Sequence, residues 1–177
     1  MTEGFKCATC GKLHNDLPRS FAAEFPDMYA NMTRQERDIR ATIGSDQCVV
    51  GQQWFFIRGC LEIPVHDSAE PFLWGLWASV REEVYDEISD SWEEQGRERV
   101  RGPFKGRLAN SLSVYTGTLD LKVKILIQPV ATRPLFIVED LEHPLAIEQH
   151  TGISEERSQS LASVLLHQER PEWPADV

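Results

Sequence analysis

Hydrophobic and polar residues alternate along much of the chain, and this period of two predicts β-strands. The alternation is clear over residues 53–63 and 118–128, and shorter apolar runs cover residues 47–50, 72–80 and 135–138. The runs over residues 47–50 and 53–63 are separated by Gly51-Gln52, which predicts a hairpin. Gly59, within the strand over residues 53–63, predicts a bulge or a close approach of another backbone segment.

Helix signals occur between and after these strands. Thr33 and Glu36 form a capping box that predicts a helix over residues 34–41, and Ser79 and Glu82 form a second one. Pro144 at a first helical position and Ser154 as an N-cap predict two more helices near the end of the chain. Most connections are hairpins, so the sequence predicts an α+β fold, mainly an antiparallel sheet with helices packed on it.

The length of 177 residues fits a single domain spanning residues 1–177, with residues 171–177 as a loose tail. A formal net charge of −10 argues against binding nucleic acid through its phosphates. It suits instead a possible protein partner, a basic one in particular. The strands also carry candidates for a local basic patch, although we prefer to interpret them as a solvated sheet face: Lys105, Arg107, Lys122 and Lys124.

The N-terminus has no basic segment followed by an apolar one, and no apolar run approaches the roughly 18 residues that span a bilayer. We therefore expect a cytoplasmic protein with no membrane association. In a reducing compartment, the four cysteines are expected to be thiols or metal ligands rather than disulfides.

Residues 5–14 carry the strongest chemical signal in the chain. Cys7 and Cys10 are three positions apart, Gly11 permits a tight turn, and His14 follows four positions after the second cysteine. Two thiolates and an imidazole at this spacing predict an N-terminal zinc knuckle, with zinc in a structural role.

The fourth ligand has to come from elsewhere in the chain. Cys48, at the start of the predicted hairpin, is the preferred candidate, and Cys60, His66 or a water molecule remain alternatives. Cys60 also suits the role of a small apolar filler. His167 is expected to be a surface or helix-end residue.

Several segments together resemble a family of short, uncharacterised bacterial proteins that is known as a domain of unknown function. The segments are Phe-Lys-Cys7-x-x-Cys10-Gly11 with His14, Cys48-Val-Val, Phe55-Phe-Ile-Arg-Gly-Cys60-Leu-Glu-Ile-Pro64, Trp74-Gly-Leu-Trp-Ala-Ser79 and His143-Pro-Leu-Ala-Ile-Glu-Gln149. The resemblance covers most of the chain. It implies a single bacterial domain, and it implies no activity and no catalytic residue.

Three hypotheses for the function follow. The first is a non-enzymatic binding or interaction domain with a structural zinc site, because no catalytic motif accompanies the knuckle. The second is a small zinc-dependent hydrolase with an open metal position near Glu62 or His143. The third is a redox protein that uses Cys7 and Cys10 as its pair.

Overall fold

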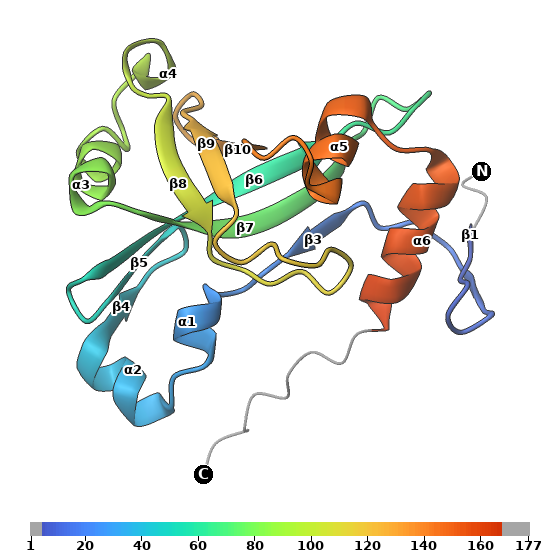
Figure 1. The fold of residues 1–177 in the computed structure, drawn as a ribbon, viewed down its shortest axis with the longest axis horizontal. Helices are drawn as coiled ribbons and strands as arrows, with labels where there is room; N and C mark the ends of the chain where they lie inside the picture. The colour runs from blue at the N-terminus through green and yellow to red at the C-terminus, as the bar shows by residue number, and fades with distance from the viewer. Residues whose placement is uncertain (1–4, 168–177) are drawn as a thin grey trace.

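The computed structural model describes residues 5–167, and two long antiparallel strands form its centre (Figure 1). Strand β6 (Trp54–Ile63) pairs with β7 (Phe72–Val80) without interruption from Phe55 opposite Val80 to Ile63 opposite Phe72. Both strands agree with the sequence prediction. Because both strands are long, each also pairs with two other strands along its second edge: β6 with β5 (Gln47–Val50) and β10 (Leu135–Val138), and β7 with β3 (Ser20–Ala22) and β8 (Phe104–Leu108).

Among the described residues, five strands close into a barrel. The antiparallel order β7, β8 (Phe104–Leu108), β9 (Lys122–Leu126) and β10 (Leu135–Val138) returns to β6 through a parallel contact. In that contact, Leu135 lies opposite Cys60, and the Cys60 N–H donates to the Pro134 carbonyl at 2.8 Å. The α+β class is therefore correct, and most strand pairs are antiparallel as predicted, but the sheet closes on itself into a barrel, which the prediction of a sheet with helices packed on it did not include.

Gly59 makes this closure possible. A Cβ at this position would lie 2.4 Å from the Phe136 ring and 2.8 Å from the Pro134 carbonyl oxygen. The pairing of β6 with β7 runs through Gly59 opposite Leu76 without an extra residue. Gly59 thus marks a close approach of β10 and not a bulge.

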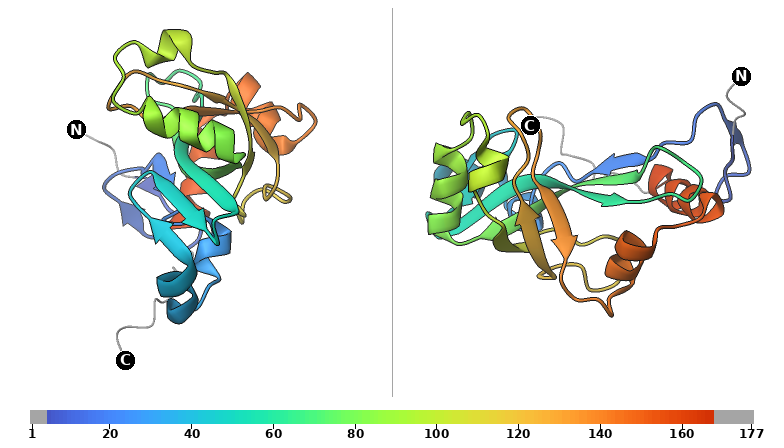
Figure 2. Two further views of the ribbon diagram at one scale, coloured as in Figure 1. Left: turned by 90° about the vertical axis from the view of Figure 1, so that its left-hand side faces the viewer. Right: turned by 90° about the horizontal axis from the view of Figure 1, so that it is seen from above.

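Three further strands extend the barrel. Strand β5 (Gln47–Val50) pairs with the first half of β6, and β4 (Ala41–Ile43) pairs with β5. Strand β3 (Ser20–Ala22) runs parallel to the first residues of β7. Figure 2 shows the β4–β5 arm projecting from the barrel.

The helices begin mostly where the sequence predicts. Helix α2 (Arg34–Arg40) has the predicted capping box, with Thr33 as N-cap, and α5 (Pro144–Thr151) and α6 (Glu155–Leu166) begin at the predicted residues. The short helices α1 (Asp27–Ala30) and α4 (Arg97–Val100) lie in connections.

The second predicted capping box is wrong. Helix α3 (Glu82–Asp90) has Arg81 as its N-cap, without a side-chain capping bond. Ser79 does not cap it because this residue still belongs to β7, where its hydroxyl contacts the Arg107 carbonyl at 3.4 Å. The strand continues one residue further than the cap pattern implies.

The main core fills the barrel and extends under the two C-terminal helices. Ile57, Leu76, Val123 and Phe136 are fully buried in this core. Leu161 of α6 belongs to the same cluster, so α6 is anchored on the barrel. A smaller core on the outer side of β6 and β7 consists of Cys48, Val50, Phe56, Trp77 and Ala109.

The N-terminal segment forms its own two-stranded hairpin of β1 (Phe5–Lys6) and β2 (Leu13–His14). Figure 1 shows this hairpin beside α6. The chain thus brings its first and last described elements together, and this contact positions the candidate site. The predicted loose tail, residues 171–177, lies outside the described residues.

Candidate metal centre

The N-terminal hairpin turns tightly between its two strands. The Cys7 N–H donates to the Lys12 carbonyl at 2.9 Å, and the Gly11 N–H donates to the Cys7 carbonyl at the same distance. Gly11 has a φ of 69°, a left-handed conformation that glycine adopts without strain. This turn brings the two thiols to one side of the hairpin.

His14 faces the same point from the second strand. Its Nε2 lies 3.5 Å from the Sγ of Cys10. The imidazole stacks on the Phe5 ring, which lies directly across the hairpin, with centroids 5.2 Å apart and an interplanar angle of 22°. The aromatic stack therefore orients one of the potential ligands.

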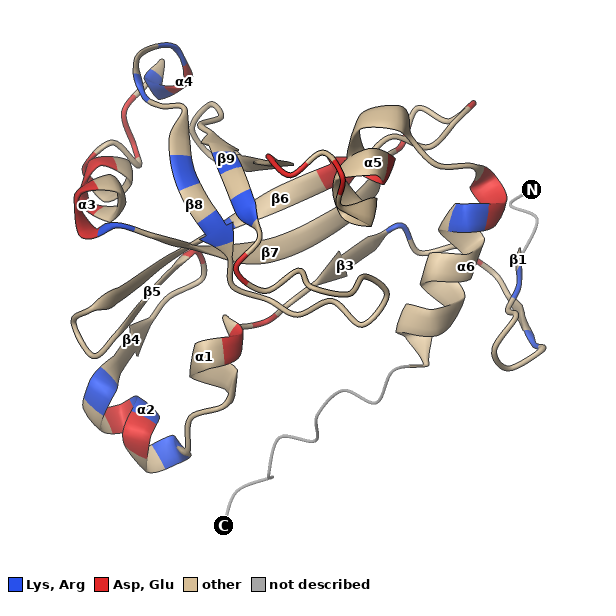
Figure 3. Ribbon diagram, viewed as in Figure 1, with Lys and Arg blue, Asp and Glu red and all other residues tan. Residues whose placement is uncertain are grey.

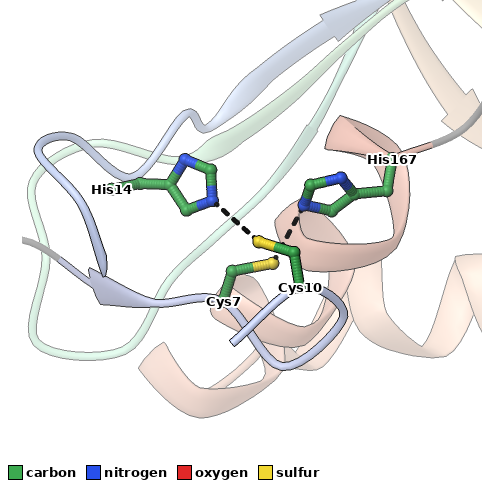
Figure 4. A group of neighbouring side chains, drawn as sticks. All are labelled: Cys7, Cys10, His14 and His167. Carbon is green, nitrogen blue, oxygen red and sulfur yellow. Dashed lines mark hydrogen bonds between the residues drawn. The ribbon is translucent and has the colours of Figure 1, made fainter. Parts of the chain in front are cut away.

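His167 is the fourth member of the group and comes from the C-cap of α6. Its Nε2 lies 3.2 Å from the Sγ of Cys7 (Figure 4). The potential ligand atoms of Cys7, Cys10, His14 and His167 all lie within 4.8 Å of one another. A tetrahedral zinc ion with two sulfur and two nitrogen ligands has ligand–ligand distances of roughly 3.3–3.8 Å. The group therefore needs only a small contraction to fit such an ion.

The hairpin also contacts α6 through hydrogen bonds that need no metal ion. The Ala8 N–H donates to the hydroxyl of Ser163 at 3.3 Å, and the Thr9 hydroxyl donates to the Ser163 carbonyl at 3.0 Å. Ser163 is buried between the helix and the hairpin. These contacts hold the Cys7–Cys10 turn against the last turn of α6.

Cys7 has the electrostatic environment of a metal ligand. Burial raises the pKa of its thiol, but hydrogen bonds from the backbone of Cys10 and Thr9 and from the Ser163 side chain outweigh this effect. The pKa falls to about 5. The thiol is then a thiolate at neutral pH, the form that binds metal ions.

The structure does not bring Cys48 to this group. Cys48 lies opposite Phe56 in the hairpin of β5 and β6, with 1% of its surface exposed, and packs in the small outer core with Trp77. Burial raises the pKa of its thiol to about 12. Cys48 thus stays protonated and packs as an apolar residue of the small core. His167, and not Cys48, is the fourth member of the metal group.

The two other candidates for a fourth ligand also lie elsewhere. Cys60 sits on β6 where the barrel closes, and burial raises the pKa of its thiol. The Nε2 of His66 lies 2.9 Å from the Thr151 carbonyl oxygen, at the end of α5. Neither belongs to the group of potential ligands among the described residues.

The candidate acid and base of a hydrolase are likewise not part of the group. Glu62 is an exposed residue near the end of β6. His143 serves as the N-cap of α5: its Nδ1 accepts from the Leu145 N–H at 3.1 Å, and its Nε2 lies 2.9 Å from the Thr116 carbonyl oxygen. Both nitrogens of His143 therefore have structural partners.

Two hollows on the described surface lie away from the metal group. One of about 470 Å³ is bordered by α2, β4 and the turn between β5 and β6. The other, of about 190 Å³, lies between β6, β10 and α5. No member of the metal group lines either hollow.

Comparison with known proteins gives a family and no function. Searches of the curated proteins and of the solved structures found no match. Within the described residues, no helix is both long and apolar enough to cross a membrane. A model of an uncharacterised protein family conserved in bacteria, DUF2199, matches residues 6–153, which include three members of the metal group but not His167. The chain belongs to this family of uncharacterised bacterial proteins.

Proposed function

We propose that the protein is a non-enzymatic binding domain in which Cys7, Cys10, His14 and His167 hold one structural zinc ion. The proximity of these four side chains, whose ligand atoms lie within 4.8 Å of one another, carries the proposal. The ion joins the N-terminal hairpin to the end of α6.

The ligand set favours zinc over other common ions. Two thiolates and two imidazoles suit a borderline-soft ion without a demand for octahedral geometry. Calcium and magnesium prefer oxygen ligands, and the group contains none. Iron–sulfur clusters use mainly cysteine ligands, and only two cysteines are present here.

Four protein ligands also favour a structural role. A catalytic zinc ion keeps a position open for water or substrate, whereas structural sites are closed by four side chains. The alternative function, a small zinc-dependent hydrolase, is therefore less well supported. His143, the most plausible base, is committed to capping a helix.

The redox hypothesis is also less well supported than zinc binding. Cysteine pairs in disulfide oxidoreductases usually lie at the start of a helix, whose dipole activates the first thiol. Here Cys7 and Cys10 lie in the turn of a β-hairpin, and two imidazoles lie next to them.

The metal content of the purified full chain tests the proposal. We expect about one zinc ion per chain in the wild type and loss of the ion in Cys7→Ser. The matched control is Cys60→Ser, which also removes a thiol and should retain zinc. A wild-type protein without metal, or a Cys7→Ser variant with full zinc content, would contradict the proposal.

A further inference from the structure

Two neighbouring strands of the barrel carry four exposed cations on the same face. In β8 and β9, Lys105 lies directly opposite Lys124, and Arg107 lies directly opposite Lys122. All four side chains are exposed, whereas Val123 and Ile125, which alternate with the two lysines of β9, are fully buried. We call these four residues the cation face (Figure 3).

The cations of this face lie close together. Side chains that are directly opposite in an antiparallel pair have Cβ atoms about 4.5–5.5 Å apart. Alternate residues along one strand are separated by roughly 6.6–6.8 Å. The face is therefore a compact array of four positive charges, each within reach of the next.

The arrangement is unfavourable in the isolated protein. Like charges directly opposite each other destabilise a sheet. Within residues 5–167, none of the four cations makes an ion pair with a carboxylate. Among the described residues, their side chains donate one hydrogen bond, from Arg107 Nη1 to the Asp120 carbonyl oxygen at 3.1 Å. In the same described part of the chain, Glu139, whose N–H donates to the Lys122 carbonyl at 3.0 Å, lies next to Lys122, whereas the Lys105–Lys124 pair has no carboxylate partner.

We propose that the cation face is a docking surface for an acidic segment of a partner protein. Four convergent cations that form no ion pair within residues 5–167 are complementary to carboxylates, and binding would relieve their mutual repulsion. The proposal gives the binding domain proposed above a class of partner. It does not depend on the metal group of Cys7, Cys10, His14 and His167, which lies at a different place in the fold.

The surroundings of the cation face favour a protein segment over nucleic acid. The outward positions of β8 and β9 have no aromatic side chain on which a base could stack. Ile137 lies opposite Lys124, and Leu126 lies opposite Leu135; all three apolar side chains are half-buried at the border of the face. A segment that combines carboxylates with apolar side chains matches both features.

The overall charge points the same way. Figure 3 shows acidic residues along α3 and basic residues on β8 and β9. The whole chain carries a formal charge of −10, which disfavours a long polyanion such as nucleic acid as the ligand. A short acidic segment needs only the four cations of the cation face.

Fluorescence anisotropy of the full chain with a labelled peptide of alternating glutamate and leucine tests the proposal. We expect saturable binding that weakens with rising ionic strength. The double variant Lys105→Gln/Lys124→Gln should bind at least about tenfold more weakly. The matched control Arg34→Gln/Arg99→Gln removes the same charge elsewhere and should bind as the wild type does.

Three results of the binding measurements would overturn the proposal. They are no binding by the wild type, an equal loss in the control variant, and tighter binding of an oligothymidylate of equal charge than of the peptide. The denaturation midpoint of the Lys105→Gln/Lys124→Gln variant should equal or exceed that of the wild type, since repulsion is removed; a clear decrease would assign these lysines a structural role instead. If the purified chain proved to hold no zinc, peptide binding would still support this proposal.

Discussion

The Sγ of Cys7 lies 3.2 Å from the Nε2 of His167, although 160 residues separate the two in the chain. One residue belongs to the N-terminal hairpin, and the other ends the last described helix. A metal ion between them would connect both ends of the described chain to the barrel through α6. The unfolded chain does not hold these groups together, so metal binding would favour the folded state.

Removal of the metal should therefore lower the stability of the protein. An ion at a free concentration of about 100 times its dissociation constant stabilises the folded state by about 2.7 kcal/mol. For a chain of this length, we expect a strong chelator to lower the melting temperature by roughly 5–10 °C. Differential scanning calorimetry with and without chelator measures this shift.

The control for that experiment is Cys7→Ser. This variant lacks a ligand of the proposed site, so its melting temperature should not respond to chelator. A chelator effect of equal size in the wild type and in Cys7→Ser would show that the ion binds elsewhere.

Cys10 and Cys48 should differ in their reactivity toward iodoacetamide. Cys10 is exposed, whereas Cys48 is buried and its pKa is raised to about 12. In the metal-free native protein, Cys10 should be alkylated and Cys48 should not, even at pH 9, where an ordinary thiol is mostly ionised. Zinc should protect Cys10, and mass spectrometry of the digested protein identifies the modified residues.

The raised pKa of Cys48 also has a consequence for stability. Between pH 9 and pH 12 the unfolded state loses the Cys48 proton while the folded state keeps it, so this residue favours unfolding progressively as the pH rises. The stability that the protonated Cys48 thiol contributes is therefore fully present below pH 9 and is lost as the pH rises to about 12. Alkylation of native Cys48 at the rate of Cys10 would contradict the placement of Cys48 in a core.

Gly59→Ala should destabilise the barrel. The added methyl group would overlap with the Phe136 ring and the Pro134 carbonyl, at the contact that closes the barrel. We expect a loss of about 1–3 kcal/mol in the free energy of unfolding, measured by urea denaturation. Gly44→Ala is the control, because its Cβ would lie 3.9 Å from the nearest atom; it should change stability by less than about 0.5 kcal/mol. Equal effects of the two substitutions would argue against a tight contact at Gly59.

Tyr115→Phe should weaken the attachment of the two C-terminal helices. The buried Tyr115 hydroxyl donates to the Glu148 carboxylate of α5, which also accepts from Arg157 of α6 at 2.8 Å. Burial, with Glu148 as a second cause, raises the pKa of Tyr115, so the hydroxyl stays protonated and keeps donating. Loss of a hydrogen bond to a charged group costs about 1.5–3 kcal/mol.

Tyr29→Phe provides the comparison for Tyr115→Phe. Tyr29 is half-buried, and none of the described hydrogen bonds involves its hydroxyl, so this substitution should change the free energy of unfolding by less than about 0.5 kcal/mol. A Tyr115→Phe variant as stable as the wild type would show that the bond to Glu148 contributes little.

Local signals in the sequence predicted the local structure well. The alternation over β6, the capping box at Thr33 and the proline at the start of α5 each reflect interactions within a few residues, and the structure confirms all three elements. The closure of the barrel was missed because it depends on one parallel contact between β6 and β10, which are distant in the chain. Only Gly59 pointed to it, as a possible close approach.

The candidate metal centre was predicted in part for the same reason. Cys7, Cys10 and His14 lie within one hairpin, and their spacing alone predicts that they converge. His167 was expected to be a surface or helix-end residue, and it lies at the C-cap of α6, but nothing in the local sequence indicates that this helix end meets the hairpin. The prediction preferred Cys48 as the fourth ligand and did not include His167 among the alternatives, because only the fold of the whole chain places His167 beside the hairpin.

The zinc affinities of His167→Ala and Cys48→Ala test the central claim most directly. Competition with a chromophoric chelator measures both, under the same conditions as the wild type. We predict that His167→Ala lowers zinc affinity by at least about 100-fold, because it removes a ligand of a closed site, and that Cys48→Ala leaves it unchanged. A loss of affinity in Cys48→Ala with full affinity in His167→Ala would contradict the proposed metal centre.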